Sequence, residues 1–126
     1  MTKVASLTRM AAWVTIFTII VLSVVPGSMR PHIFGNDSAE HLAAYFIAGA
    51  LFASGYPRPM QLLFSGVLLA ICAGSLEFVQ LWIPARTAST GEFALSAIGA
   101  SVGLLIIANI RRTRERKLLI SCKSSL

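Results

Sequence analysis

The chain alternates between long uncharged runs and short polar or proline-containing breaks. The uncharged runs cover residues 10–29, 42–57, 59–76 and 93–110. A helix needs roughly 17–25 apolar residues to span a bilayer. The first, third and fourth runs meet this, whereas the second does so only if its helix starts near Ser38 and includes His41. The pattern predicts four transmembrane helices, at about residues 10–28, 38–55, 60–83 and 90–110.

Prolines and glycines separate the four runs. Pro26-Gly27 ends the first, two prolines at 57 and 59 separate the second from the third, and Pro84 ends the third. Proline removes a helical hydrogen bond and clashes with the preceding turn, so each proline marks a break. The sequence therefore predicts one all-α domain over residues 1–126, a polytopic bundle of four transmembrane helices followed by a basic tail at 111–126.

Composition excludes an ordinary soluble domain. Apolar residues make up 56% of the chain and charged residues only 13%, about half the charged fraction of a soluble domain. The mean hydropathy is +0.75. The first run could instead be a cleaved signal peptide, since Lys3 and Arg9 precede it, but no A-x-A cleavage signal comes before Pro26.

Basic residues indicate the orientation. Lys3 and Arg9 precede the first helix, Arg58 lies between the second and third, and six further basic residues follow the fourth. With four spans these segments share one side, which the positive-inside rule places in the cytoplasm. We expect a multi-pass protein of the cell (inner or plasma) membrane with both termini cytoplasmic and the lipid bilayer as its first partner. The tail is most simply a topology anchor, with anionic lipid binding as the alternative. No nucleic-acid partner is expected.

Neither a disulfide nor a local metal motif is apparent. Cys72 falls in the middle of the third span and Cys122 in the tail, so the two thiols are not expected to meet. The chain has no C-x-x-C pair and no two-histidine helix motif. We therefore expect no metal site and no cofactor.

Polar residues concentrate at the ends of three helices that would share the outer side. Ionisable groups within spans are costly and are usually functional or paired. The candidate binding cluster consists of Asp37, His41, Tyr45, Glu77, Gln80, Arg86, Glu92 and Ser96. The alternative is a packing network in which Glu77 pairs with Arg86 or His41.

Some of these side chains also have simpler explanations. Asp37 and Glu40 have the spacing of a capping box at a helix start. Tyr45, like Trp13 and Trp82, could be an interfacial aromatic.

Small residues repeat along the third and fourth helices. Gly66, Ala70 and Gly74 recur every four residues, and Gly99 and Gly103 form a G-x-x-x-G match. Such stripes let helices approach closely in lipid. We expect helices two, three and four to pack together, with the first contributing mainly apolar surface. The Gly99–Gly103 face could alternatively contact another subunit, including a second copy of the chain.

The order of these motifs resembles the VanZ-like family of membrane proteins over about residues 20–107. The matching positions are Asp37, His41, Tyr45, Glu77, Gln80, Arg86, Gly99 and Gly103. Three positions depart from the family pattern: Ser38 replaces a lysine, Glu92 an aspartate and Ser96 an asparagine. The resemblance implies a protein of the cell envelope, and the family's founding member is associated with resistance to the glycopeptide antibiotic teicoplanin.

Two classes of function follow. The first is a non-catalytic membrane protein that binds an envelope glycan or lipid-linked component through the outer polar cluster. The second is a small membrane enzyme, with Glu77 or Glu92 as general base, His41 as acid and Arg86 holding an anionic group. A structural subunit of a membrane assembly is a third alternative. The sequence lacks a nucleophile elbow, a phosphate loop and a metal-ligand set, which favours the non-catalytic class.

Overall fold

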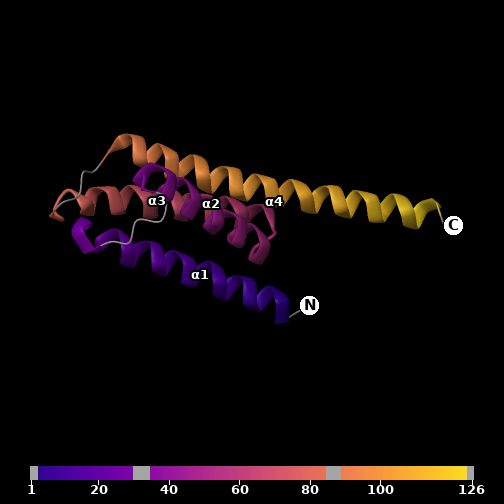
Figure 1. Cartoon of the computed structure of the whole chain (residues 1–126). Helices are drawn as coiled ribbons and strands as arrows, with labels where there is room; N and C mark the ends of the chain where they lie inside the picture. Colours follow the sequence, from indigo (N-terminus) through magenta and orange to yellow (C-terminus); the bar gives the residue numbers. More distant parts are fainter. Residues whose placement is uncertain (1–2, 30–34, 85–88, 125–126) are drawn as a thin grey trace.

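The chain forms an all-helical bundle. The computed structural model describes residues 3–29, 35–84 and 89–124. These hold four α-helices, α1 (Lys3–Val24), α2 (Asp37–Gly55), α3 (Pro59–Gln80) and α4 (Thr90–Ser124), and a short 3-10 helix, η1 (Gly27–Met29). Successive helices run up and down the bundle, and the start of α1 and the end of α4 lie toward the same end (Figure 1). The predicted all-α class and the four helices are confirmed.

Three helices, α1, α3 and α4, are long and apolar enough to cross a membrane. The remaining helix, α2, is less apolar because its first turn carries Asp37, Glu40 and His41. It is also the most enclosed helix, since it packs against α1, α3 and α4. Burial by protein rather than lipid explains how this helix accommodates polar residues. As expected for the second run, α2 begins before His41 and includes it.

Several helix ends differ from the predicted bounds, and α1 and α3 end early, at Val24 and Gln80. α1 begins at Lys3, seven residues earlier than predicted. α4 continues through the basic segment to Ser124 and projects beyond the other helices (Figure 1). At α2 the N-cap is Asn36, whose side-chain oxygen accepts a hydrogen bond from the Ser38 backbone N–H at 3.0 Å. The expected Asp37–Glu40 capping box is therefore wrong, because the cap lies one residue earlier.

Glycines bring the backbones of α2 and α4 into contact. A Cβ atom at Gly99 would overlap the Leu42 carbonyl oxygen, and one at Gly103 would overlap that of Phe46. On the other helix, a Cβ at Gly49 would overlap the Ala100 carbonyl oxygen. Gly99 and Gly103 thus lie where the two backbones are closest, the geometry that small residues permit. Gly49 completes the contact, although it belongs to no G-x-x-x-G match.

The glycines of α3 pack differently. A Cβ at Gly66 would lie 3.5 Å from a methyl carbon of Leu104, and one at Gly74 would lie 3.5 Å from the ring of Phe93. Both are ordinary contacts, so these glycines pack against side chains of α4 rather than against its backbone. Helices α2, α3 and α4 do pack together as predicted, and within the described residues α1 contacts only α2 and α3.

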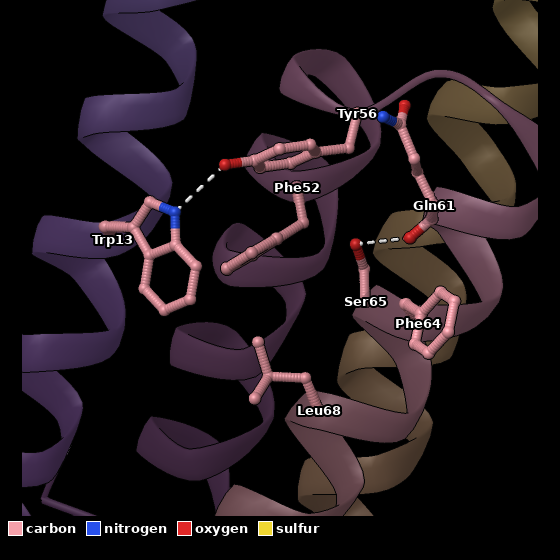
Figure 2. Close-up of a pocket in the computed structure, with 7 residues that line it drawn as sticks. All are labelled: Trp13, Phe52, Tyr56, Gln61, Phe64, Ser65 and Leu68. Carbon is pink, nitrogen blue, oxygen red and sulfur yellow. Dashed lines mark hydrogen bonds between the residues drawn. The ribbon is translucent and has the colours of Figure 1, made fainter.

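The end of the bundle nearest the start of α1 is held by aromatic and arginine contacts. The Trp13 indole N–H donates to the Tyr56 hydroxyl at 3.0 Å, and the Trp13 ring meets Phe52 edge-on (Figure 2). Arg9 donates to the Gly55 carbonyl at 2.9 Å and Arg111 to the Ser54 carbonyl at 3.1 Å. Two arginines from different helices thus satisfy the C-terminal carbonyls of α2, where positive charge is favourable.

A polar site at one end of the bundle

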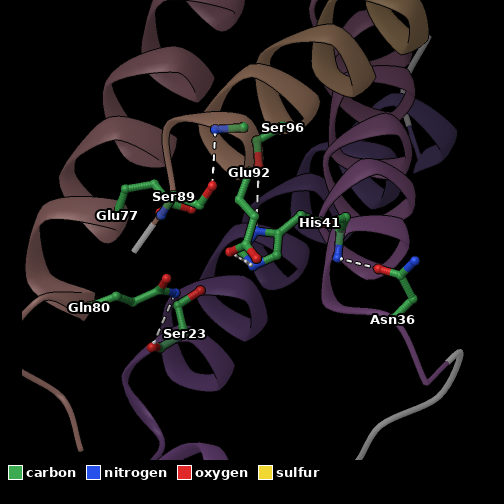
Figure 3. Close-up of polar contacts among 10 residues, drawn as sticks. Ser23, Asn36, His41, Glu77, Gln80, Ser89, Glu92 and Ser96 are labelled. Carbon is green, nitrogen blue, oxygen red and sulfur yellow. Dashed lines mark hydrogen bonds and ion pairs between the residues drawn. The ribbon is translucent and has the colours of Figure 1, made fainter. Parts of the chain in front are cut away.

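The opposite end of the bundle collects the polar side chains. There α1 and α3 end, with Ser23 and Gln80 near their last turns, and α2 and α4 begin, with His41 and Glu92 in their first turns. Figure 3 shows side chains from all four helices directed toward this region. The up-and-down topology therefore joins residues that are far apart in the sequence, as the charge pattern predicted.

His41 is the centre of the site. Its side chain is 7% exposed, and its Nε2 lies 3.7 Å from a carboxylate oxygen of Glu92. Its other ring nitrogen, Nδ1, lies 3.4 Å from the Ser96 hydroxyl, which is 1% exposed. Glu92 and Ser96 are four residues apart on one face of α4, so the imidazole is held between them (Figure 3).

Glu77 enters the site from α3. One of its carboxylate oxygens accepts a hydrogen bond from the Ser89 backbone N–H at 3.1 Å, just before α4 begins. A ring nitrogen of His41 and one carboxylate oxygen each from Glu77 and Glu92 all lie within 4.8 Å of one another. Three different helices thus bring one nitrogen and two oxygen donors to a common point, a set that could hold a metal ion.

Two fully enclosed polar side chains flank these donors. Gln80 is 1% exposed, and its amide N–H donates to the Ser23 backbone carbonyl at 3.5 Å. Its amide oxygen has no hydrogen-bond partner among the described residues. Tyr45 is also 1% exposed, and its hydroxyl interacts with the Cys72 thiol and lies near Glu77. Interpreting Tyr45 as an interfacial aromatic is therefore wrong.

A polar recess opens beside the buried donors. It has a volume of about 670 Å³ and is lined by Gly35, Asn36, Asp37, Ser38 and Glu92. Glu92 belongs to both environments, since it is one of the residues that line the recess and its carboxylate lies 3.7 Å from the ring of buried His41. Glu92 thus connects the open recess with the enclosed imidazole.

The structure brings together His41, Glu77, Glu92 and Ser96, and places Asp37 at the recess. Arg86 lies outside the described residues, so its pairing with Glu77 stays a prediction. Four contributors were not foreseen: Ser23, Asn36, Cys72 and Ser89. They act largely through backbone groups, a helix cap or simple proximity, which a pattern of charged side chains does not indicate. Of these four, only Ser23 could have been identified from the sequence, because it is a polar residue at the end of an apolar helix.

The metal-capable donor set was also missed, for a topological reason. His41, Glu77 and Glu92 stand on three helices at separations of 36 and 15 residues. Local motifs place two ligands on one helix or in one loop. The expectation of no metal site rested on the absence of such motifs. It did not consider ligands that tertiary packing brings together from separate helices.

Comparisons with known proteins provide no family or relative for this chain. A scan against protein-family models, a search of curated proteins and a search of solved structures each found no match to this chain.

Proposed function

We propose that this chain is a multi-pass protein of the cell envelope that binds the polar head of an envelope component at the His41–Glu92 end of its bundle. The observation that carries the proposal is the position of Glu92, which lines an open recess and at the same time contacts an imidazole enclosed by the helices. The resemblance of the site motifs to the VanZ-like family motivates the envelope setting and a link to glycopeptide resistance of the teicoplanin type.

The membrane arrangement is supported by helix length and packing. Besides the three long apolar helices, α2 has 19 residues and so measures about 28 Å. This is close to the roughly 30 Å of a hydrocarbon core. We therefore infer four spans in the plasma membrane. Arg9, Arg58 and Arg111 lie toward one end, which we place in the cytoplasm. The recess then faces outward.

The chemistry of the recess favours a ligand rich in hydrogen-bond donors. Asp37 and Glu92 supply carboxylates, and Asn36 and Ser38 add an amide and a hydroxyl. Carboxylates accept hydrogen bonds from hydroxyl and ammonium groups and repel phosphate at close range. A glycan or amino-sugar head group, carried on a lipid whose chain remains in the bilayer, matches both the recess and the apolar helix surfaces around it.

The test is direct binding of a short-chain lipid-linked disaccharide to the purified full chain in detergent. We expect saturable binding that Asp37→Asn and Glu92→Gln each weaken about tenfold, the loss of one charge-assisted hydrogen bond. Glu115→Gln is the matched control, because Glu115 is an exposed carboxylate on the projecting part of α4. Equal binding by all three variants would contradict the site. In cells, the same two variants should lose any protection against teicoplanin while remaining in the membrane.

One observation favours an enzymatic alternative. The His41 imidazole lies between Glu92 and Ser96 with Glu77 nearby, which is the arrangement of a general acid–base group oriented by its neighbours. In that case His41→Gln would retain binding of the disaccharide probe but abolish release of its head group. Absence of any release by the unaltered protein would leave the binding function alone.

A further inference from the structure

We propose that His41, Glu77 and Glu92 form a divalent metal site, with Zn²⁺ as the best-suited ion. The inference deepens the proposed envelope-binding function and rests on it, because Glu92, one of the three donors, also lines the recess. It begins from the geometry already described: one imidazole nitrogen and two carboxylate oxygens, from α2, α3 and α4, within 4.8 Å of one another.

The separations suit a site that closes slightly around an ion. Zinc binds nitrogen and oxygen ligands at about 2.0–2.1 Å, so tetrahedral ligands stand about 3.3 Å apart. The His41–Glu92 pair, at 3.7 Å, is already near that spacing. Glu77 is half-buried near the end of α3, and its carboxylate oxygen lies within 4.8 Å of the other two donors.

Charge favours an ion of this valence. Two carboxylates that converge inside a membrane bundle carry a desolvation cost, which a divalent cation offsets by making the set neutral overall. A mixed set of imidazole and carboxylates suits Zn²⁺ better than Mg²⁺, which prefers oxygen ligands alone and retains several waters.

Ser96 supplies the hydrogen-bond partner that metal-binding histidines usually have on their other ring nitrogen. Its hydroxyl lies 3.4 Å from Nδ1 of His41. If Nδ1 carries the proton and donates to Ser96, the lone pair of Nε2 points toward Glu92 and the shared centre. Ser96 is thus a positioning residue that fixes the tautomer and the orientation of the ring.

An independent observation points to a ligand at the same place. The Gln80 side chain is 99% buried, and its amide oxygen makes no hydrogen bond within the described residues. Gln80 is one helical turn from Glu77 on α3. Buried polar atoms normally have partners. Three protein ligands leave a fourth position for water or a ligand head group, which would supply this oxygen with a donor.

The test is zinc binding by the purified full chain in detergent, stripped with a chelator and titrated with Zn²⁺ alone. We expect one ion per chain and a raised thermal unfolding midpoint. Glu77→Gln and Glu92→Gln should weaken binding roughly 100-fold or more, and Ser96→Ala about tenfold. Glu115→Gln should bind as the unaltered chain does. Excess Mg²⁺ should not compete.

The outcomes separate this site from adventitious binding and from the proposed function. Zinc that binds equally well to the Glu77→Gln/Glu92→Gln double variant would overturn the site. Glu92→Asp keeps the charge and shortens the side chain, so it tests the geometry even if the glutamine variants fail to fold. The visible spectrum of the Co²⁺-loaded chain should change with His41→Gln if the imidazole is a ligand. Because zinc is titrated without an envelope ligand, its failure would leave disaccharide binding standing.

Discussion

At the scale of single residues, three glycines determine how closely α2 and α4 approach. Gly49, Gly99 and Gly103 each face a backbone carbonyl of the other helix, with no room for a Cβ atom. In a membrane, where apolar side chains gain little by leaving lipid, such close packing is a main source of helix association. This contact also fixes His41 on α2 against Glu92 and Ser96 on α4, so the geometry of the site depends on it.

Alanine substitution separates the close glycines from the loosely packed one. Gly66→Ala should be neutral or stabilising, because its Cβ would have ordinary contacts and alanine is about 1 kcal/mol better than glycine in a helix. Gly99→Ala should cost roughly 1–3 kcal/mol through overpacking. Thermal unfolding of the two variants in the same detergent makes the comparison. If Gly99→Ala were as stable as Gly66→Ala, the close approach of α2 and α4 would be wrong.

How much of the site could be predicted differs from residue to residue. His41, Glu77 and Glu92 were identified because each stands at the end of an uncharged run, and the up-and-down order of the helices placed these ends at one level. Tyr45 was placed in the polar cluster with the membrane interface as the alternative, because a tyrosine in an apolar run is equally compatible with an enclosed or an interfacial position. The Glu77–Ser89 contact and the Asn36 cap could not be found, since they depend on the path of the backbone at helix ends.

At the scale of the elements, α2 is short, comparatively polar and yet the most enclosed helix. By hydrophobicity alone α2 is the weakest candidate for a membrane span among the four helices. Its enclosure by the other helices was not visible in its sequence. Its last turn illustrates how neighbours compensate. The carbonyls of Ser54 and Gly55 receive Arg111 from α4 and Arg9 from α1. The basic residues that were expected to set topology therefore also cap a helix.

Arg111→Met tests the capping role of that arginine, with Arg112→Met as its control. Methionine keeps an apolar stem of similar length but removes the guanidinium, so Ser54 loses its charged donor. We expect a loss of about 1–2 kcal/mol, seen as a drop of a few degrees in the unfolding midpoint. Arg112 is exposed. Arg112→Met removes the same positive charge as Arg111→Met, so this variant should have the unfolding midpoint of the unaltered chain. A matching drop for both would assign the effect to net charge instead.

At the scale of the whole molecule, the antiparallel order of four helices divides it into two chemically different ends. One end carries Arg9 and Arg111 with the aromatic contacts of Trp13, and the other carries the His41 site. The four-helix architecture was accessible from the sequence because uncharged runs and prolines delimit each element. The length of α4 was not, because its exposed basic segment lacks the apolar run by which the other helices were recognised.

The last prediction concerns how these two ends are placed across the membrane. The arginine-rich end should face the cytoplasm, because translocating clustered basic residues is unfavourable. Cys72→Ala leaves Cys122, an exposed residue near the end of α4, as a natural single-cysteine reporter. For the opposite end, Ser28→Cys in a chain without Cys72 and Cys122 places a thiol in η1, where Ser28 is exposed. A membrane-impermeant maleimide should label position 28 in intact cells and Cys122 only in inside-out vesicles. Labelling of both positions from the same side would contradict the antiparallel four-span arrangement, and labelling of Cys122 alone in intact cells would invert it and place the His41 recess in the cytoplasm.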